Sequence, residues 1–342
     1  MTKKSGTSTG SVLSRTKSRD GTILITTIWI LAILSILAVG IGFRVSLEAR
    51  LSKYNMDRLK AVYYAKAGIV KAQAMLLKDS TPGYDTIREC GITVPFDKDV
   101  RSVFTEKLAD GGFEVNYEEA GKTYYGMTDE ERKININKAD QLVLTTLLGK
   151  DNKAAEENRD YENVAASIVN WRGMARAPGG GAWDDDYETL AAPYKCKHAD
   201  FSAIEELMLV KGMKPELFDS IKDYVTVYGD GKVNINTATE RVMRACGLGE
   251  NLIAGIMNVR NGRDLTAGTK DDGLVNDITP EAAARWNIAF DANEKNALNN
   301  FTTGSNYFRI ESKGAVDRSK ISARIVCVID RKAKRLKYYR EY

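Results

Sequence analysis

Few side chains in this 342-residue sequence have the types and spacings that catalysis requires. The chain has one histidine, His198, and much of the acid–base and metal-site chemistry of proteins depends on that side chain. Neighbouring carboxylates can act as acid and base, but nothing in the sequence places a nucleophile beside such a pair. We therefore predict that the protein is not an enzyme, and that His198 packs on the surface or caps a helix.

The cysteines are scattered without a CxxC pair, so the sequence predicts neither a zinc site nor a dense disulfide framework. Two alternatives remain for them. One disulfide could form in an oxidising compartment, or the thiols could be free and pack as small apolar side chains. The four cysteines are Cys90, Cys196, Cys246 and Cys327.

A run of carboxylates follows the glycine-rich stretch at 179–181. Carboxylates that are adjacent in a loop repel one another unless solvent or a cation screens them, and Ca²⁺ takes its oxygen ligands from such loops. The candidate ligands are Asp184, Asp185, Asp186 and Glu188. The alternative is a solvated acidic loop, because no EF-hand spacing is present. A weaker second candidate group consists of Asp271, Asp272 and Asp277.

Glycines at two turns raise the alternative of DNA binding by a helix-hairpin-helix module. Gly247 and Gly249 precede a helical pattern, and Gly212 stands in an earlier turn. Such glycines let backbone N–H groups approach a phosphate at a helix N-terminus. Glu250 lies where the phosphate would bind, however, and the net charge of the chain is only +4. We expect structural hairpins and no nucleic-acid partner.

The elements that carry these residues begin with a long apolar segment. No charged side chain occurs from Thr22 to Phe43, and a helix of roughly 22 residues spans about 30 Å, the hydrocarbon thickness of a bilayer. Basic residues dominate the preceding segment, which predicts a cytoplasmic N-terminus. The run is too long for a cleaved signal peptide. Its helical period continues without proline to Leu77, so we predict one helix with residues 22–43 in the membrane and 44–78 outside it.

Strand patterns flank a helical middle part. Period-two alternation, as in Phe113–Glu119, predicts an antiparallel sheet built from residues 79–136 and 301–342, and helix-like segments fill residues 137–300. This order indicates an α+β fold with an α-helical domain inserted into a small sheet. The pattern K-[IV]-N-I-N-[KT]-A starts at Lys133 and again at Lys232. We expect Asn137 or Asn236 to cap the helix that follows, as in repeated sterile-alpha-motif-like hairpins.

Two features resemble a known family. The basic leader that ends in Gly21, followed by an uncharged helix and a stalk, resembles the signal of type IV pilins and pseudopilins, which prepilin peptidase cleaves after the glycine. Most members carry Glu at the fifth mature position. Counted from Thr22, that position holds Thr26, and its lack of Glu resembles the minor pseudopilin K family of type II secretion. The order KININ, SIVNWRG, DDDYETLAAPY, FSAIEELMLVKGM and YVTVYGDGKVNINTA resembles the inserted domain of the same family.

The resemblance implies a cleaved leader at residues 1–21 and a pilin-like long helix packed on the sheet. It also implies a structural Ca²⁺ held by some of the four carboxylates at 184–188, and a place at the tip of the periplasmic pseudopilus, where the protein initiates assembly and supports export across the outer membrane. The implied partners are the minor pseudopilins I and J, the major pseudopilin and prepilin peptidase. The implied location is the bacterial inner membrane, crossed once, with most of the chain in the periplasm. For the long helix, the alternative is a plain single-pass anchor with a helical stalk. For the function, the alternative is a membrane-tethered DNA receptor of the competence type.

Overall fold

The computed structural model describes Gly6 and residues 20–81, 83–90, 98–119, 121–149, 155–173, 185–189, 193–279 and 292–342. Most of the predicted leader, residues 1–21, therefore lies outside the described residues. Contacts between Cα atoms divide the chain into two units, Met1–Met56 and Asp57–Tyr342.

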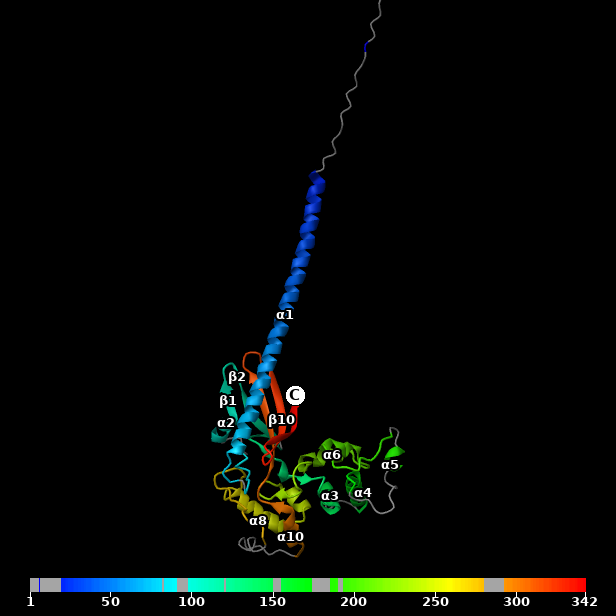
Figure 1. Ribbon diagram of the computed structural model, residues 1–342, viewed down its shortest axis with the longest axis vertical. Helices are drawn as coiled ribbons and strands as arrows, with labels where there is room; N and C mark the ends of the chain where they lie inside the picture. The colour runs from blue at the N-terminus through cyan, green and yellow to red at the C-terminus, as the bar shows by residue number, and fades with distance from the viewer. Residues whose placement is uncertain are drawn as a thin grey trace, which may run out of the picture. The chain divides into compact units, whose positions relative to one another are not determined.

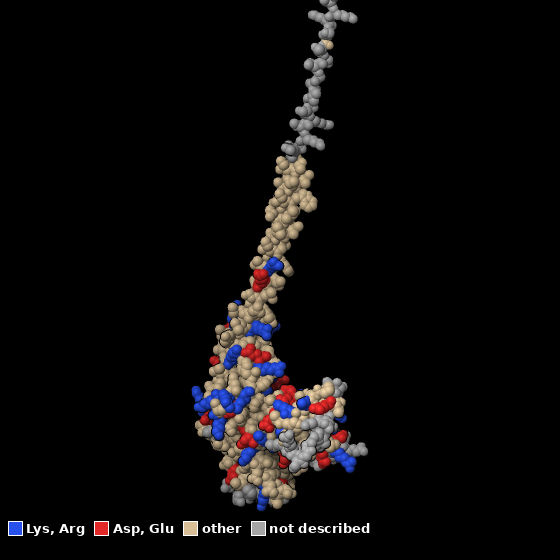
Figure 2. Space-filling model, turned by 45° about the vertical axis from the view of Figure 1, so that its right-hand side comes forward, with Lys and Arg blue, Asp and Glu red and all other residues tan. Residues whose placement is uncertain are grey.

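A continuous helix, α1 (Asp20–Leu77), carries the uncharged apolar run (Figure 1). Its residues 21 to 56 are all exposed, and Figure 2 shows a long stretch of the helix without acidic or basic side chains. By length and composition, α1 can cross a membrane. The predicted unbroken helix is confirmed, and the proline-free sequence rich in Leu and Ala explains it, because these residues lose little conformational freedom in a helix.

The second unit contains an antiparallel sheet of seven strands in the order β1-β2-β9-β10-β11, with β3 paired to β2 and β4 paired to β9. The predicted antiparallel sheet is thus confirmed. Buried and half-buried side chains alternate along β2 and β9, as expected for strands with one face on a core. The strands are β1 (Thr105–Leu108), β2 (Gly111–Glu119), β3 (Lys122–Tyr125), β4 (Thr128–Asp129), β9 (Tyr307–Val316), β10 (Ser322–Asp330) and β11 (Arg335–Glu341), and the short helix α2 (Lys98–Phe104) precedes β1.

The end of α1 packs very closely on this sheet, because small residues face each other at the contact. Ala61, Ala65 and Ala72 of α1 are completely buried. A Cβ atom added at Gly314 of β9 would collide with the backbone of Ala61 and Ala65. Glycine is therefore required at this position by the approach of two backbones.

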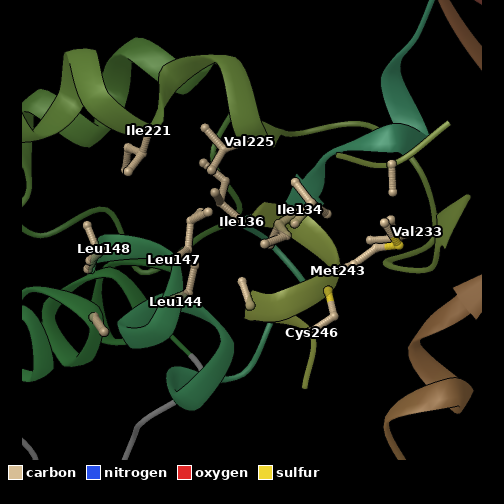
Figure 3. Packing of buried hydrophobic residues seen from close by; sticks show 14 of the residues in the cluster. Ile134, Ile136, Leu144, Leu147, Leu148, Ile221, Val225, Val233, Met243 and Cys246 are labelled. Carbon is tan, nitrogen blue, oxygen red and sulfur yellow. The ribbon is translucent and has the colours of Figure 1, made fainter. Parts of the chain in front are cut away.

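In the described part of residues 130–300, helices are the main regular structure, and they surround a second core (Figures 1 and 3). Figure 3 shows that α3 supplies Leu144, Leu147 and Leu148 to this core opposite Ile221 of α6. The elements of the first half are η1 (Glu130–Arg132), β5 (Ile134–Asn135), α3 (Gln141–Leu148), α4 (Ala155–Trp171), α5 (Asp185–Glu188), η3 (Ile204–Leu209), α6 (Pro215–Ile221), η4 (Lys222–Tyr224) and β6 (Val225–Thr226). Those of the second half are β7 (Val233–Asn234), α7 (Glu240–Ala245), α8 (Glu250–Asn261), α10 (Ala292–Ala297), η5 (Leu298–Asn300) and β8 (Phe301–Thr302).

The sequence repeat corresponds to a structural repeat that extends beyond the motif itself. Each copy begins with a two-residue strand that pairs in parallel with a strand at the end of the same copy, β5 with β6 and β7 with β8. In each copy a buried arginine at the end of a helix donates to two carbonyl groups of the repeated motif. Arg172 donates to Ile136 and Ala139, and Arg260 donates to the corresponding Ile235 and Ala238.

The prediction that Asn137 or Asn236 caps a helix is wrong. Asp140 caps α3 and Thr239 caps α7, each accepting from a backbone N–H of the first turn. Asn137 is buried and exchanges two hydrogen bonds with the backbone of Phe201. Its counterpart Asn236 exchanges two with the backbone of Val275. Both asparagines thus satisfy buried loop backbone, which needs a partner once water is excluded, and the true cap is the residue three positions later.

Candidate functional site

The outward face of α1 in the second unit carries a stripe of large apolar side chains. Its residues are Leu59, Tyr63, Val70 and Leu77, which are 52, 62, 63 and 43% exposed. Their spacing of four, seven and seven residues keeps them on one face of a helix, and seven-residue spacing is typical of helices that pack on other helices. We call these four residues the α1 stripe.

The charged side chains beside the α1 stripe fold back onto the sheet. Lys60 and the hydroxyl of Tyr64 both donate to Asp110 at 2.6 Å, and these bonds lower the pKa of Asp110 to about 2. Two further lysines of α1 make ion pairs with strands. The pairs are Lys66 with Glu341 (3.0 Å) and Lys71 with Glu106 (2.7 Å). The outward face of the helix consequently stays apolar although its flanks are charged.

A buried carboxylate, Asp129, joins the sheet to the helical segment. It accepts hydrogen bonds from Asn234 (3.0 Å), Thr237 (2.6 Å) and Ser305 (2.7 Å), and from the backbone N–H of Glu131 (2.8 Å). Burial raises its pKa, and the hydroxyl donors oppose that effect. Because Asn234 and Thr237 belong to the second copy of the repeat and Ser305 lies just before β9, this one carboxylate at the end of β4 fixes the second copy against β4 and β9.

Arg331 adds an ion-pair network next to Asp129. It donates to Asp79 (2.8 Å) and, through both terminal nitrogens, to Asp85 (2.9 and 2.8 Å). It also donates to the carbonyl of Ser305. Burial raises the pKa of Asp85 to about 6 in spite of this guanidinium. The network links the loop after α1 to the loop after β10.

The two glutamates that follow Asp129 have opposite environments. Burial alone would raise the pKa of Glu130, but the charges of Lys133 (3.3 Å) and Arg309 (2.6 Å) outweigh it and lower the pKa to about 2. Glu131 accepts only backbone N–H bonds, from Asn306 and Tyr307. Burial, reinforced by the charge of Asp129, therefore raises the pKa of Glu131 to about 7.

These buried groups were not singled out from the sequence. The consecutive Asp129, Glu130, Glu131 and Arg132, directly before the first repeat motif, gave the one local signal. Asp85 and Arg331 gave none, since they are separated by most of the chain. The bonds from Asn234, Thr237 and Ser305 to Asp129 hold the helical segment on the sheet.

The turn glycines have the expected backbone role. Gly212 and Gly247 have positive φ values of 82° and 96°, which glycine adopts without strain. Gly249 is the N-cap residue that precedes α8, and its N–H donates to Glu294 at 3.0 Å. Glu250 pairs with Arg244. The position where a phosphate would bind is thus occupied by a carboxylate of the same chain, which favours structural hairpins over DNA contact.

The predicted calcium ligands are only partly described. Asp184 lies outside the described residues, and of Asp185 and Asp186 only their place in α5 is described. Glu188 is exposed, next to Tyr187, whose ring packs 5.3 Å from that of Trp171. Among the residues that the structure describes, no three or more His, Cys, Asp or Glu side chains gather as a metal site.

In the second acidic candidate group, Asp271 and Asp272 share the hydroxyl of Thr269 as a donor, whereas Asp277 has a different partner. Asp271 accepts from Thr269 and from the backbone of Arg263 and Asp264, and these bonds lower its pKa to about 2. Asp272 accepts from Gly268. Asp277 instead caps its own turn by accepting from Thr279.

The remaining predicted residues are placed as follows. His198 is exposed, with a positive φ of 47°. All four cysteines are free and buried, so the free-thiol alternative is the one that the structure shows. Gly21 and Thr22, the predicted processing site, lie in α1 and are exposed, with no atom within 4 Å of a Cβ added at Gly21.

Comparison with known proteins gives consistent results. The family model described as type II secretion system (T2SS), protein K, matches residues 127–230. The type II secretion system protein K of Pseudomonas aeruginosa PAO1 is 26% identical over 239 residues, which are 67% of this chain and 68% of that protein. The protein K of Pectobacterium carotovorum subsp. carotovorum is 33% identical over 88 residues, which are 25% of this chain and 27% of that protein.

A solved structure has the same fold. One chain in the crystal structure of the GspK-GspI-GspJ complex from the enterotoxigenic Escherichia coli type 2 secretion system matches with a TM-score of 0.60 and 14% sequence identity, over 85% of this chain and 99% of that chain. The matched family model covers Asp129 and the first copy of the repeat, whereas Asn234, Thr237 and Ser305, which donate to Asp129, lie beyond it. Together, the family model, the two relatives and the shared fold support type II secretion minor pseudopilin K as the family of this chain.

Proposed function

We propose that this minor pseudopilin occupies the tip of the periplasmic pseudopilus, initiates its assembly and supports protein export across the outer membrane, without catalysing a reaction itself. The α1 stripe is the observation that carries the proposal, because large apolar side chains exposed in a row favour packing against other helices. The complex GspK-GspI-GspJ contains a chain of the same fold. We infer that the partners on the α1 stripe are the minor pseudopilins I and J, and that the major pseudopilin follows below them.

The composition of α1 near its start supports the tip position. Thr26 stands where most pseudopilins carry a glutamate, and its hydroxyl donates to the carbonyl of Ile23 in the same helix (2.9 Å). It therefore offers no negative charge to the N-terminal amine of a subunit above. The bulky segment of residues 130–300 supports the same position, since it adds volume that a filament shaft would have to accommodate.

The membrane arrangement follows from charge and length. We propose that residues 22–43 cross the inner membrane once, that the basic N-terminus stays in the cytoplasm, and that the second unit lies in the periplasm. Prepilin peptidase would then meet the Gly21–Thr22 bond at the cytoplasmic side, and the freed helix could leave the lipid and join other helices.

The proposal is tested by placing a charge on the α1 stripe. We expect Val70→Glu to reduce co-purification with the I and J subunits by about tenfold or more, because burying an unpaired carboxylate in a helix interface costs several kcal/mol. Val103→Glu is the matched control, since Val103 is also exposed but lies in α2. Pull-down of the three subunits from membranes extracted in detergent measures the effect. Equal recovery with Val70→Glu and with the control would contradict the packing role.

We also propose a structural Ca²⁺ on Asp184, Asp185, Asp186 and Glu188. The donor set consists of carboxylates, which are the ligands that hard Ca²⁺ prefers, and the contact of Tyr187 with Trp171 anchors the segment. A bound ion would screen the repulsion between the adjacent carboxylates. We expect calorimetric titration of the full chain to show Ca²⁺ binding that Asp185→Asn with Asp186→Asn abolishes, whereas Asp277→Asn retains it. Heat that is absent in the parent protein, or unchanged in the double variant, would exclude this site.

A further inference from the structure

A large cleft lies in the first half of the helical segment, apart from the α1 stripe and from the Asp129 cluster. It has a volume of about 1180 Å³ and lies between α3, α4, the turn at Gly212, α6 and α7. Pockets for small molecules measure roughly 300–1,000 Å³. This cleft is therefore large enough for several amino-acid residues.

The floor of the cleft is apolar. Leu147 and Leu148 of α3, Val164 of α4 and Ala245 of α7 line it and are almost completely buried. Leu217 of α6 is half-buried on its wall. Figure 3 shows Leu147 and Leu148 on α3, on the side of the helix toward α6 and Ile221. The four floor residues are already shielded from water, so the apolar surface open to an occupant includes the half-buried Leu217, where contact with an apolar side chain removes that surface from water.

Positive charges lie around this floor. Arg241 donates to the carbonyls of Leu147 and Ser220, both at 2.8 Å, and its guanidinium lies 4.6 Å from the centre of the Tyr224 ring. These partners carry no net charge, so the positive charge of Arg241 is not neutralised by them. Lys214 also lines the cleft, is exposed, and makes no ion pair within the described part of the chain.

The other charged side chains at the cleft do not cancel the positive charge of Arg241 and Lys214. Lys211 and Arg244 add two cations, and Glu250 pairs with Arg244 from outside the lining. Asp160 and Glu216 are the acidic residues among the lining side chains, and both are exposed. Cations thus outnumber carboxylates, and walls of low polarity strengthen their field within the cleft.

We propose that this cleft binds an extended acidic segment of a partner polypeptide, with an apolar side chain on the leucine floor and carboxylates toward Arg241 and Lys214. A wholly apolar segment would desolvate these two cations without compensation. An anion without apolar groups would leave the apolar surface of Leu217 in contact with water. Alternation of acidic and apolar residues satisfies both parts of the surface. The proposal does not depend on the filament position, since the α1 stripe and this cleft belong to different elements.

Fluorescence anisotropy of labelled peptides tests this proposal on the full chain in phosphatidylcholine nanodiscs. The probe alternates Asp or Glu with Leu or Phe. One comparison peptide has Lys at every acidic position, and another has Ser at every apolar position. We expect the probe to bind at least about tenfold more tightly than either comparison peptide, since both the charges and the apolar groups are needed.

Variants locate the binding. Lys214→Glu should weaken binding of the probe about fivefold or more, because a charge at the edge of an interface is reversed. Lys232→Glu is the matched control, with the same change at an exposed lysine that does not line the cleft. Leu217→Trp, which fills the wall, should weaken binding as well, and unchanged circular dichroism would show that it folds. The proposal would be overturned if the three peptides bound equally tightly, or if an oligonucleotide bound as tightly as the acidic–apolar probe. It would also be overturned if Lys214→Glu and Lys232→Glu changed the binding of the probe equally.

Discussion

At the scale of single residues, the buried carboxylates show how one side chain can join distant parts of the chain. Asp129 holds Asn234, Thr237 and Ser305 at the same time. If this carboxylate were removed, the hydroxyl of Ser305 would lose its acceptor, whereas Asn234 would keep the carbonyl of Asp85. A buried donor without a partner costs about 1–3 kcal/mol. The cluster therefore has a large influence on stability for its size.

Glu131 should make stability depend on pH. Burial raises its pKa from 4.5 to about 7, so between these pH values the folded protein holds a proton that the unfolded chain has released. The free energy of unfolding contributed by this group consequently falls as the pH rises through that window. In Glu131→Gln, we expect the decrease in the free energy of unfolding between these pH values to be smaller by about 2 kcal/mol than in the parent protein, since glutamine does not ionise.

Urea unfolding of the full chain at several pH values between 5 and 8 measures this effect. The control is Glu118→Gln, because Glu118 is exposed and should leave the slope unchanged. A slope in Glu131→Gln equal to that of the parent protein would mean that Glu131 ionises normally.

At the scale of elements, the contact between α1 and β9 depends on the absence of a side chain at Gly314. An added Cβ would meet the backbone of α1, which cannot move aside like a side chain. We expect Gly314→Ala to lower the free energy of unfolding by roughly 1–3 kcal/mol, as overpacking does. Gly83→Ala is the control, because nothing lies within 4 Å of its added Cβ. Chemical denaturation compares the two, and equal stability would show that α1 can shift.

The elements themselves were largely predictable. The uncharged run and its helical continuation predicted α1, and alternation predicted the strand over Phe113–Glu119, which the structure extends to Gly111. The repeat was visible from K-[IV]-N-I-N-[KT]-A. The prediction that its asparagines cap helices was wrong. A local pattern identifies a side chain that is able to cap, but it does not reveal the buried loop backbone at Phe201 or Val275 that binds this side chain instead.

Contacts between distant elements were not predictable in the same way. Asp85 and Arg331 have no shared periodicity, and neither the cleft lined by Arg241 nor its apolar floor is visible before the helices are packed. The calcium ligands stay a prediction, since they rest on composition and resemblance at Asp184 to Glu188.

At the scale of the whole molecule, the chain combines an apolar helix with a folded unit whose surface carries many charged side chains (Figure 2). Release of the helix from lipid should depend on cleavage after Gly21. We expect Gly21→Ala to leave an uncut precursor in cells that contain prepilin peptidase, because glycine lacks the side chain that would obstruct a peptidase cleft. Intact mass of the membrane-extracted protein measures this. A Gly21→Ala protein that begins at Thr22 would contradict it.

The pairing of β2 with β9, in the register Gly111 with Val316, has a consequence for the order of events during biosynthesis. Strand β2 is synthesised long before its partner β9, and the whole helical segment is synthesised between them. Until the last strands arrive, the edge of β2 has no backbone partner, and unpaired edges attract other chains. Pairing of β2 with β9 must therefore wait until β9 has been synthesised, and we expect a chain that stops before Tyr307 to aggregate.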